Sequence, residues 1–327
     1  MSVVVEPIER FEFEANGLVA EHPPRWTNQN KLVVHAVASP PGAVHAGRIQ
    51  YSRWAAMPLP GTVPASRFCI EAREGFFDYP GSQPGAMIWH LNFADPHLFG
   101  YYGGPLFAQD EMQVAEHPAL ASLKQALEAL GAAARTVDRG DPTPVLVAGV
   151  ERRCRVATEP DASAGRPGGL YGNAFAAAPA AAIRAATTAV SPPTISNIIA
   201  LAAPTNGSGR YTREQLAYIL QTAWSGFRAA ALETARLAGP DARTSVHTGF
   251  WGCGAFGGNR TVMTALQLAA ARLAGVDLVF FTGSAPGKAA FREGAATLEA
   301  FEGWTTPDQL LEGMEQRGLR WGMSDGN

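Results

Sequence analysis

Five glycines lie within ten residues of one stretch of the chain. They are Gly249, Gly252, Gly254, Gly257 and Gly258. Backbone without Cβ atoms can fold closely around a ligand and point its N–H groups at it. A helix predicted to begin near Arg260 adds its positive dipole end at the same place. These properties predict a cradle for a phosphate or a diphosphate.

The same loop contains the dinucleotide fingerprint Gly-x-Gly-x-x-Gly at Gly252, Gly254 and Gly257. In dinucleotide-binding folds an acidic residue about 20 positions further on closes the next strand and binds a ribose. The candidate here is Asp277, which opens the apolar run 278–281 instead of closing it. Its carboxylate would therefore lie at the wrong end of the strand. Because the fingerprint alone is weakly specific, an NAD-dependent oxidoreductase is a disfavoured alternative.

A second group of polar and small residues follows a predicted buried strand, where ligands of open α/β sheets bind. Its members, in chain order, are Asn92, Asp95, Gly103, Gly104, Gln109, Asp110 and Glu111. The last three open a predicted helix. Acids in a first helical turn are stabilised by the helix dipole, so the simplest interpretation of Asp110 and Glu111 alone is structural.

Hydrophobic periodicity predicts the elements that position these two groups. Strands are expected over 86–94, 144–149, 195–201, 245–248 and 276–282, and helices over 109–116, 120–130, from 211 onward, over 260–274 and over 307–315. Thr212 and Gln215 form a capping box, and Thr306 precedes Pro307 as an N-cap. The alternation of strands and helices predicts an α/β fold with a mixed, mostly parallel central sheet and helices on both faces.

Two regions carry less periodicity. The proline-punctuated first 74 residues predict an accessory layer of strands and loops packed on the core, with a strand over 32–37. The stretch 161–193 is rich in Ala, Gly and Pro, and we interpret it first as a flexible surface excursion. The alternative is a loop that covers the substrate, with Tyr171 reaching inward.

Composition excludes several classes of protein. The 327 residues carry a net charge of -3, and no basic run is longer than Arg152–Arg153, so a nucleic-acid or anionic-membrane partner is not expected. No apolar run is long enough for a membrane helix, and the charged first residues do not form a signal peptide. The three cysteines are widely spaced, which argues against disulfides and zinc. We expect a soluble, cytoplasmic protein.

Both groups of residues resemble the poly(ADP-ribose) glycohydrolase family. Its diphosphate loop, T-G-x-W-G-x-G-x-F-G-G, is matched at every specified position from Thr248 to Gly258. Its catalytic loop reads roughly D-F-A-N, then three glycines, then Q-E-E. The corresponding segments here are Asn92-Phe93-Ala94-Asp95, Gly103-Gly104-Pro105 and Gln109-Asp110-Glu111. The resemblance extends from about residue 75 to about residue 285.

The catalytic loop departs from the family pattern. Pro105 replaces the third glycine, which removes an N–H and fixes φ. The spacing from the glycines to the acids is shorter, Asp110 replaces the first glutamate, and Asn92 and Asp95 alter both ends of D-F-A-N. The second glutamate, the family's catalytic acid, is retained as Glu111. An altered loop with the acid retained predicts related chemistry on a changed substrate.

The resemblance implies a macrodomain-like domain over 75–300, between the accessory segment 1–74 and a C-terminal helix and tail over 301–327. It implies a hydrolase that cleaves the glycosidic bond at C1″ of ADP-ribose in mono- or poly-ADP-ribosylated substrates, without a metal or another cofactor. Glu111 would be the general acid, assisted by Asp110. The substrate would be bound by Asn92, Asp95, Gly103, Gly104, Gln109, Tyr171, Thr248, Gly249, Gly252, Cys253, Gly254, Ala255, Phe256, Gly257, Gly258 and Asn259. We expect a monomer.

Two alternatives stay open. A non-catalytic reader of ADP-ribose would result if Pro105 and the short loop misplace Glu111. The oxidoreductase is the other alternative, and it would prefer NADH to ADP-ribose.

Overall fold

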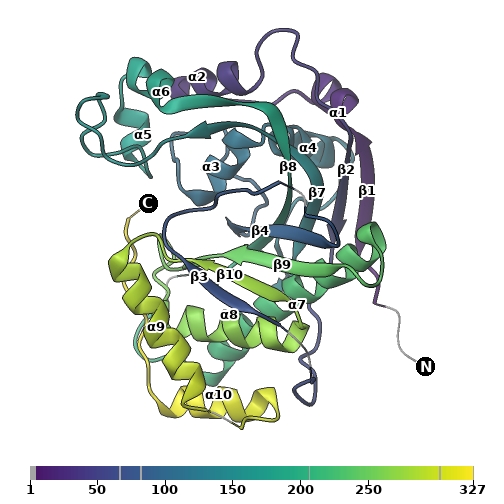
Figure 1. The fold of residues 1–327 in the computed structure, drawn as a ribbon, viewed down its shortest axis with the longest axis vertical. Coiled ribbons are helices and arrows are strands. Elements are labelled where there is room, and N and C mark those ends of the chain that lie inside the picture. Colours follow the sequence, from purple (N-terminus) through teal and green to yellow (C-terminus); the bar gives the residue numbers. More distant parts are fainter. Residues whose placement is uncertain (1–4, 66–67, 82, 206, 302, 327) are drawn as a thin grey trace.

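The computed structural model describes residues 5–65, 68–81, 83–205, 207–301 and 303–326. Within these residues, one eight-stranded sheet runs through the middle of the molecule in the order β1-β2-β7-β8-β4-β9-β10-β3 (Figure 1). Its strands are β1 (Glu9–Glu14), β2 (Arg48–Arg53), β3 (Ile70–Arg73), β4 (Ala86–Ala94), β7 (Val145–Val156), β8 (Thr187–Ala202), β9 (Arg243–Thr248) and β10 (Asp277–Phe281). A separate small ribbon pairs β5 (Val137–Asp138) with β6 (Asp141–Pro142).

The sheet is mixed and mostly parallel, which confirms the predicted fold class. Strands β8, β4, β9, β10 and β3 pair in parallel, whereas β1, β2 and β7 join the sheet in antiparallel fashion. Because parallel strands end at one edge, the loops after β4, β8 and β9 meet there.

Helices cover both faces of the sheet. One face carries α1 (Ala15–Glu21), α2 (Gln29–Ala38), α3 (Gln109–Glu116), α4 (Ala119–Ala129), α5 (Ala174–Ala177) and α6 (Ala180–Ala186) (Figure 1). The other face carries α7 (Arg213–Ala238) and α8 (Arg260–Ala274). Helices α9 (Ala285–Glu299) and α10 (Pro307–Gln316) pack outside these two. Strand β4 shows why both faces need a cover. Trp89 and Leu91 are buried under α7 and α8, while His90 and Asn92 are buried on the opposite face.

Helix ends agree with the capping residues read from the sequence. The Thr212 side chain accepts from the Gln215 N–H at the start of α7, Thr306 caps α10, and α8 ends at Gly275 in the left-handed conformation. Strands β7 and β8 are much longer than predicted, because their outer halves continue as an antiparallel pair beyond the neighbouring strands.

The strand predicted over 32–37 is wrong, because this segment is helix α2. The Asn28 side chain accepts from the N–H groups of Asn30 and Lys31 and so begins a helix. Val33, Val34 and Val37 then face a small cluster that contains Phe107 and Phe175. The β-branched residues indicated a strand, but the N-cap and this packing determine the outcome.

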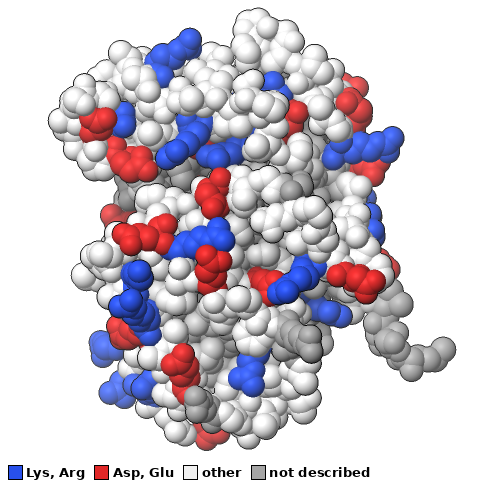
Figure 2. Space-filling model, viewed as in Figure 1, with Lys and Arg blue, Asp and Glu red and all other residues white. Residues whose placement is uncertain are grey.

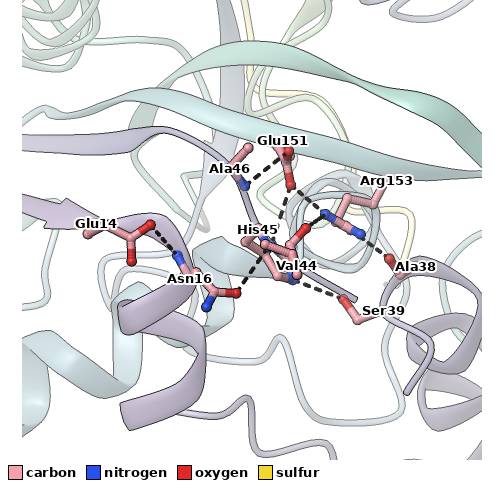
Figure 3. Close-up of polar contacts among 9 residues, drawn as sticks. All are labelled: Glu14, Asn16, Ala38, Ser39, Val44, His45, Ala46, Glu151 and Arg153. Atoms are coloured by element: carbon pink, nitrogen blue, oxygen red, sulfur yellow. Dashed lines mark hydrogen bonds and ion pairs between the residues drawn. The ribbon is translucent and has the colours of Figure 1, made fainter. Parts of the chain in front are cut away.

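The first 74 residues, expected as a layer of strands and loops on the core, supply strands to both edges of the sheet and the helices α1 and α2. The loop from Ser39 to Ala46 is fastened to β7 by a polar cluster (Figure 3). Arg153 donates to the carbonyl oxygens of Ala38 (2.8 Å) and Val44 (3.0 Å) and pairs with Glu151. The C-terminal end of α2 is thereby fixed to the sheet. The boundaries at residues 74 and 300 stay predictions.

The segment 161–193, interpreted first as a surface excursion, contains α5, α6 and the start of β8. Leu170, Phe175 and Ile183 are buried in the same small cluster as α2. The segment therefore packs on the molecule through a small core that it shares with α2, α3 and β7.

Candidate active site

Two loops at the carboxyl edge of the sheet form the candidate site. Strands β4 and β9 are parallel neighbours, with His90 opposite His247. The strands end at Ala94 and Thr248, so the polar loop after β4 and the glycine-rich loop after β9 leave the sheet side by side. A Cβ atom added at Gly249 would lie 3.5 Å from the ring of Phe93, which places the starts of the two loops in contact.

The glycine-rich loop is anchored from below by buried polar side chains. The Trp251 indole donates to the Leu201 carbonyl oxygen of β8 (2.9 Å). Gln267 of α8 contacts the Thr248 hydroxyl (2.6 Å) and donates to the Gly249 carbonyl oxygen (3.1 Å). Thr248 is fully buried, so its side chain holds the loop and faces α8.

The glycines allow the loop to close on itself. Gly252 has a φ of +73°, and a Cβ there would lie 2.5 Å from the Ala203 side chain. The Gly258 N–H donates to the Gly252 carbonyl oxygen (2.8 Å). Asn259 then caps α8 by accepting from the N–H groups of Thr261 and Val262. The loop and the positive end of α8 therefore point to the same place.

The upper turn of this loop retains backbone donors. Among the described groups, none accepts a hydrogen bond from the N–H of Gly254, Ala255 or Phe256. Three successive N–H groups of this kind can bind an anion without a lysine or arginine side chain. Cys253 lies in the same turn, but burial raises the pKa of its thiol to about 12, so it is not a ready nucleophile.

Helix α3 brings the acidic pair to the edge of β4. Asp110 is buried and accepts from the Asn92 side chain (3.0 Å). Gln109 accepts from the Phe93 N–H (2.7 Å) and donates to the Leu91 carbonyl oxygen (3.1 Å), so it fastens the helix to the strand. The three polar residues Asn92, Gln109 and Asp110 are thus brought together as the sequence predicted.

Glu111 is the third residue of α3 and is 3% exposed. Its carboxylate accepts from the Ala108 N–H (3.0 Å) at the start of the helix. Burial raises the pKa of Glu111, while the Lys31 ammonium opposes the shift. Burial and the Glu111 charge raise the pKa of Asp110 well above its usual range. Two adjacent acids of increased proton affinity can supply a proton in general acid catalysis.

The remaining residues predicted after β4 lie around this pair. Asp95 accepts from the His97 N–H (2.9 Å) in a turn at the end of the strand. The Gly103 carbonyl oxygen accepts from the N–H groups of Thr27 (2.9 Å) and Asn28 (3.0 Å), so this glycine faces the N-terminal segment. Gly104 forms the next turn with Tyr101, and Pro105 is exposed.

Tyr171 reaches the acidic pair from the segment 161–193. Its side chain is 42% exposed overall, while desolvation of the hydroxyl end near the Gln109 backbone raises its pKa to about 12. The negative charges of Glu111 and Asp325 contribute to that shift, so Tyr171 lies between the start of α3 and the C-terminal tail. This position agrees with the alternative interpretation, a segment that covers the site.

The C-terminal tail, residues 319–326, lies along the glycine-rich loop, a contact that sequence patterns did not indicate. Trp321 stacks on Tyr211 with ring centroids 4.4 Å apart, and the Arg320 carbonyl oxygen accepts from the Asn259 side chain (2.8 Å). The Asp325 N–H donates to the Gly254 carbonyl oxygen (3.4 Å). The loop is therefore enclosed by sequence-distant segments.

Lys31 is the functional candidate that sequence reasoning missed. Its side chain is fully buried, its Nζ donates to the Tyr102 carbonyl oxygen (2.6 Å), and its helix α2 packs against α3, which carries the acidic pair. Only folding brings residue 31 to residue 111. The one available signal was a lysine in a first helical turn, where a positive charge is unfavourable, and it was hidden because this segment was predicted as a strand.

The position of Asp277 argues against the oxidoreductase. Asp277 begins β10, where its carboxylate pairs with Arg243 and accepts from the Cys69 N–H (2.8 Å). Arg243 begins β9, so this ion pair lies at the opposite edge of the sheet from the glycine-rich loop. A ribose bound at that loop would be out of its reach.

Neither the surface charge nor the arrangement of possible metal ligands indicates a particular kind of ligand. Figure 2 shows basic and acidic side chains intermixed on the viewed face. Exposed charges also pair with one another, as in Arg213–Asp308 (2.8 Å). In the described part of the chain, no group of three His, Cys, Asp or Glu side chains converges as metal ligands would. No described helix is long and apolar enough to cross a membrane. The expected lack of nucleic-acid partners stays a prediction.

Comparison with known proteins supports the resemblance. Residues 171–288 match the family described as poly(ADP-ribose) glycohydrolase (PARG), macro domain fold. This match includes Tyr171 and the glycine-rich loop and confirms the resemblance over that part of the chain. Glu111 lies outside it.

Solved structures also align with the chain. The poly(ADP-ribose) glycohydrolase from Thermomonospora curvata is 18% identical, with 86% of this chain and 98% of that chain covered at a TM-score of 0.46. The enzyme from Deinococcus radiodurans in complex with ADP-ribose is 15% identical, with 88% and 95% covered at a TM-score of 0.38. No curated protein sequence matches the chain.

Proposed function

We propose that this protein is an ADP-ribose glycohydrolase that cleaves the glycosidic bond at C1″ of ADP-ribose in mono- or poly-ADP-ribosylated substrates. One observation carries the proposal. A buried acidic pair with raised pKa values lies at the same sheet edge as a glycine-rich loop whose N–H groups at residues 254–256 have no acceptor among the described groups. The first feature supplies a proton and the second binds a diphosphate, and ADP-ribose presents both requirements in one ligand.

Glu111 is the proposed general acid. The bond between C1″ and the leaving oxygen breaks, and the carboxyl proton moves to that oxygen. Positive charge develops on the ribose ring, and water then adds at C1″ and returns a proton to Glu111. Burial keeps the pKa of Glu111 raised, so the carboxyl group holds a proton to donate. Asp110, bonded to Asn92, orients the distal ribose and its neighbour Glu111.

The diphosphate is assigned to the turn from Gly252 to Gly258. The N–H groups of Gly254, Ala255 and Phe256 and the positive end of α8 provide the electrostatic attraction. Phe256 packs over the turn between diphosphate and ribose, and Tyr171 closes the ribose end. Asn92, Asp95 and the Gly103–Gly104 backbone line that end in the proposed complex.

A substrate panel tests the proposal. Purified protein is incubated with poly(ADP-ribose) and with serine-, arginine- and glutamate-linked mono-ADP-ribose, and released ADP-ribose is quantified. We expect release from at least one substrate. Glu111→Gln should reduce release by about 100-fold or more, the usual contribution of a general acid, while calorimetry shows ADP-ribose binding retained. Glu128→Gln, on the exposed end of α4, is the matched control.

A non-catalytic ADP-ribose reader is the second candidate. It is favoured by one contact, because the Glu111 carboxylate already accepts from the Ala108 N–H and would have to turn toward the substrate. Binding of ADP-ribose without release from any substrate would contradict the hydrolase and identify the reader. Preference for NADH over ADP-ribose would contradict both.

A further inference from the structure

The N-terminal segment from Arg25 to Lys31 is hydrogen-bonded to the loop between Tyr101 and Gly104. The Arg25 N–H donates to the Tyr102 hydroxyl (2.8 Å), and the Thr27 hydroxyl donates to the Gly103 carbonyl oxygen (2.8 Å). A Cβ added at Gly103 would lie 2.4 Å from the Arg25 carbonyl oxygen, so the two backbones are in direct contact. This loop leads straight to the acidic pair of α3.

Lys31 is the charged member of that segment. Its Nζ donates to the carbonyl oxygens of Tyr102 (2.6 Å) and Tyr101 (3.5 Å), and its side chain is fully buried. Helix α2 is fixed at both ends, by the Asn28 cap and by the Arg153 contact with Ala38 (Figure 3). The ammonium is therefore held in one place.

This position is unfavourable for a cation. Burial lowers the pKa of Lys31 to about 8, and the first turn of a helix repels positive charge. The Glu111 and Asp110 carboxylates oppose the shift. The chain carries 26 lysines and arginines, of which only Lys31, Lys124 and Lys288 are lysines. At a buried site a compact ammonium differs from a guanidinium, because it fits a smaller space and can release its proton.

We propose that Lys31 is a positioning residue for the reaction proposed above, one that stabilises the Glu111 carboxylate left after proton donation. A buried acid without a nearby cation holds its proton too firmly to give it up. Lys31 counters that effect, and its bonds to Tyr101 and Tyr102 hold the loop against α3. This inference rests on the proposed function for its catalytic part only.

Other titratable groups face Glu111 as well. Asp110 precedes it on α3, Asp95 approaches from the end of β4, and Tyr171 approaches from the segment 161–193. On α2 itself, His35 lies one turn beyond Lys31, with a pKa lowered by burial. Asp95 raises the pKa of Glu111, whereas Lys31 lowers it. Lys31 is therefore the cation that balances the acids of this site.

The first test does not depend on turnover. Protein labelled with ¹³Cε-lysine gives three lysine signals, which Lys124→Arg and Lys288→Arg variants assign. We expect Lys31 to titrate near pH 8, and Glu111→Gln to lower its pKa further, because a carboxylate that stabilised the ammonium is lost. An unchanged Lys31 titration in Glu111→Gln would overturn the pairing, whether or not the protein is a hydrolase.

The second test is the pH dependence of kcat/KM. Lys31→Gln keeps a hydrogen-bond donor but removes the charge, so the pKa of Glu111 should rise. The high-pH limb, which reports the general acid, should then move upward by roughly one pH unit, and the maximal rate should fall about tenfold. Lys31→Met should show the same shift and a lower melting temperature.

Lys124→Gln is the matched control, because Lys124 pairs with Glu128 on α4. It should leave the profile unchanged. A Lys31→Gln profile superimposable on that of the unsubstituted protein would overturn the positioning role even if thermal stability drops. If no substrate is hydrolysed, the proposed function fails, and the lysine titration still decides whether Lys31 and Glu111 are paired.

Discussion

Gly252 is the residue at which the glycine-rich loop tolerates least change. An alanine there would have to adopt φ near +73° and place Cβ 2.5 Å from the Ala203 side chain. We expect Gly252→Ala to lower the free energy of unfolding by about 1–3 kcal/mol and to weaken ADP-ribose binding at least tenfold. Urea denaturation and calorimetry measure the two effects.

Gly168→Ala is the matched control, since nothing lies within 4 Å of an added Cβ at that position. It should alter neither quantity by more than a few tenths of a kcal/mol. Wild-type affinity in Gly252→Ala would show that this turn does not form the diphosphate cradle.

Local patterns grouped the polar residues of α3. Gln109, Asp110 and Glu111 share one helical turn, and the resemblance to the family's catalytic loop, not their types and spacing alone, made them a candidate site, which stays a prediction. Lys31 also interacts electrostatically with Glu111 in the fold, but 80 positions separate them in the chain, and no local pattern records that interaction. Thr248 was predicted to bind substrate, and the structure places its hydroxyl against Gln267 because the strand still runs at that residue.

At the scale of elements, the start of α2 links stability to the site. Asn28→Ala removes the cap that accepts from the N–H groups of Asn30 and Lys31, which should cost about 1 kcal/mol. Because Lys31 lies in the uncapped turn, we also expect ADP-ribose release to fall several-fold. Thermal denaturation and the release assay give the two readouts.

Thr306→Ala provides the comparison, since Thr306 caps α10 in the same way at a helix that does not contact the site. It should produce a similar loss of stability and normal release. Equal activity in the two variants would mean that α2 serves stability alone.

Caps also explain which elements were predictable. Helices α3, α8 and α10, and the start of α7, were located closely because a polar N-cap, a proline or a terminal glycine marks these ends. Helix α2 was mistaken for a strand because its valines indicated β-structure, whereas the structure shows the Asn28 cap that begins the helix. The ends of β7 and β8 depend on partner strands, which a linear pattern does not specify.

At the scale of the whole molecule, a segment near each end of the chain lies against the candidate site. The segment from Arg25 to Lys31 holds one loop, and the tail from Arg320 to Asp325 lies on the other. Sequence patterns predicted the layered sheet, because strand and helix alternation is a property of the whole chain. They did not predict that these flanking segments lie against the two loops, because such contacts depend on tertiary packing alone.

The folded molecule also buries neutral histidines, which makes its stability depend on pH. Burial lowers the pKa of His117 to about 3, and its ring contacts the Gln113 carbonyl oxygen (2.8 Å) and Ser196 (3.0 Å). In the unfolded chain the ring binds a proton below pH 6.5, whereas the folded protein resists protonation down to about pH 3. The contribution of His117 to stability is therefore complete above pH 6.5 and is lost as the pH falls through that window.

The carboxyl groups of Asp110, Glu111 and Glu116 change the stability with pH in the opposite direction, because their pKa values are raised in the folded protein. A comparison of variants isolates the histidine. Near pH 5, the slope of the free energy of unfolding against pH should be smaller in His117→Gln than in the unsubstituted protein, by roughly 1.3 kcal/mol per pH unit. The reason is that the variant binds one proton fewer on unfolding. Urea denaturation between pH 4.5 and pH 7 measures the slope. The exposed His97, changed to Gln, should leave it unchanged, and equal slopes in both variants would mean that the His117 ring is already charged in the fold.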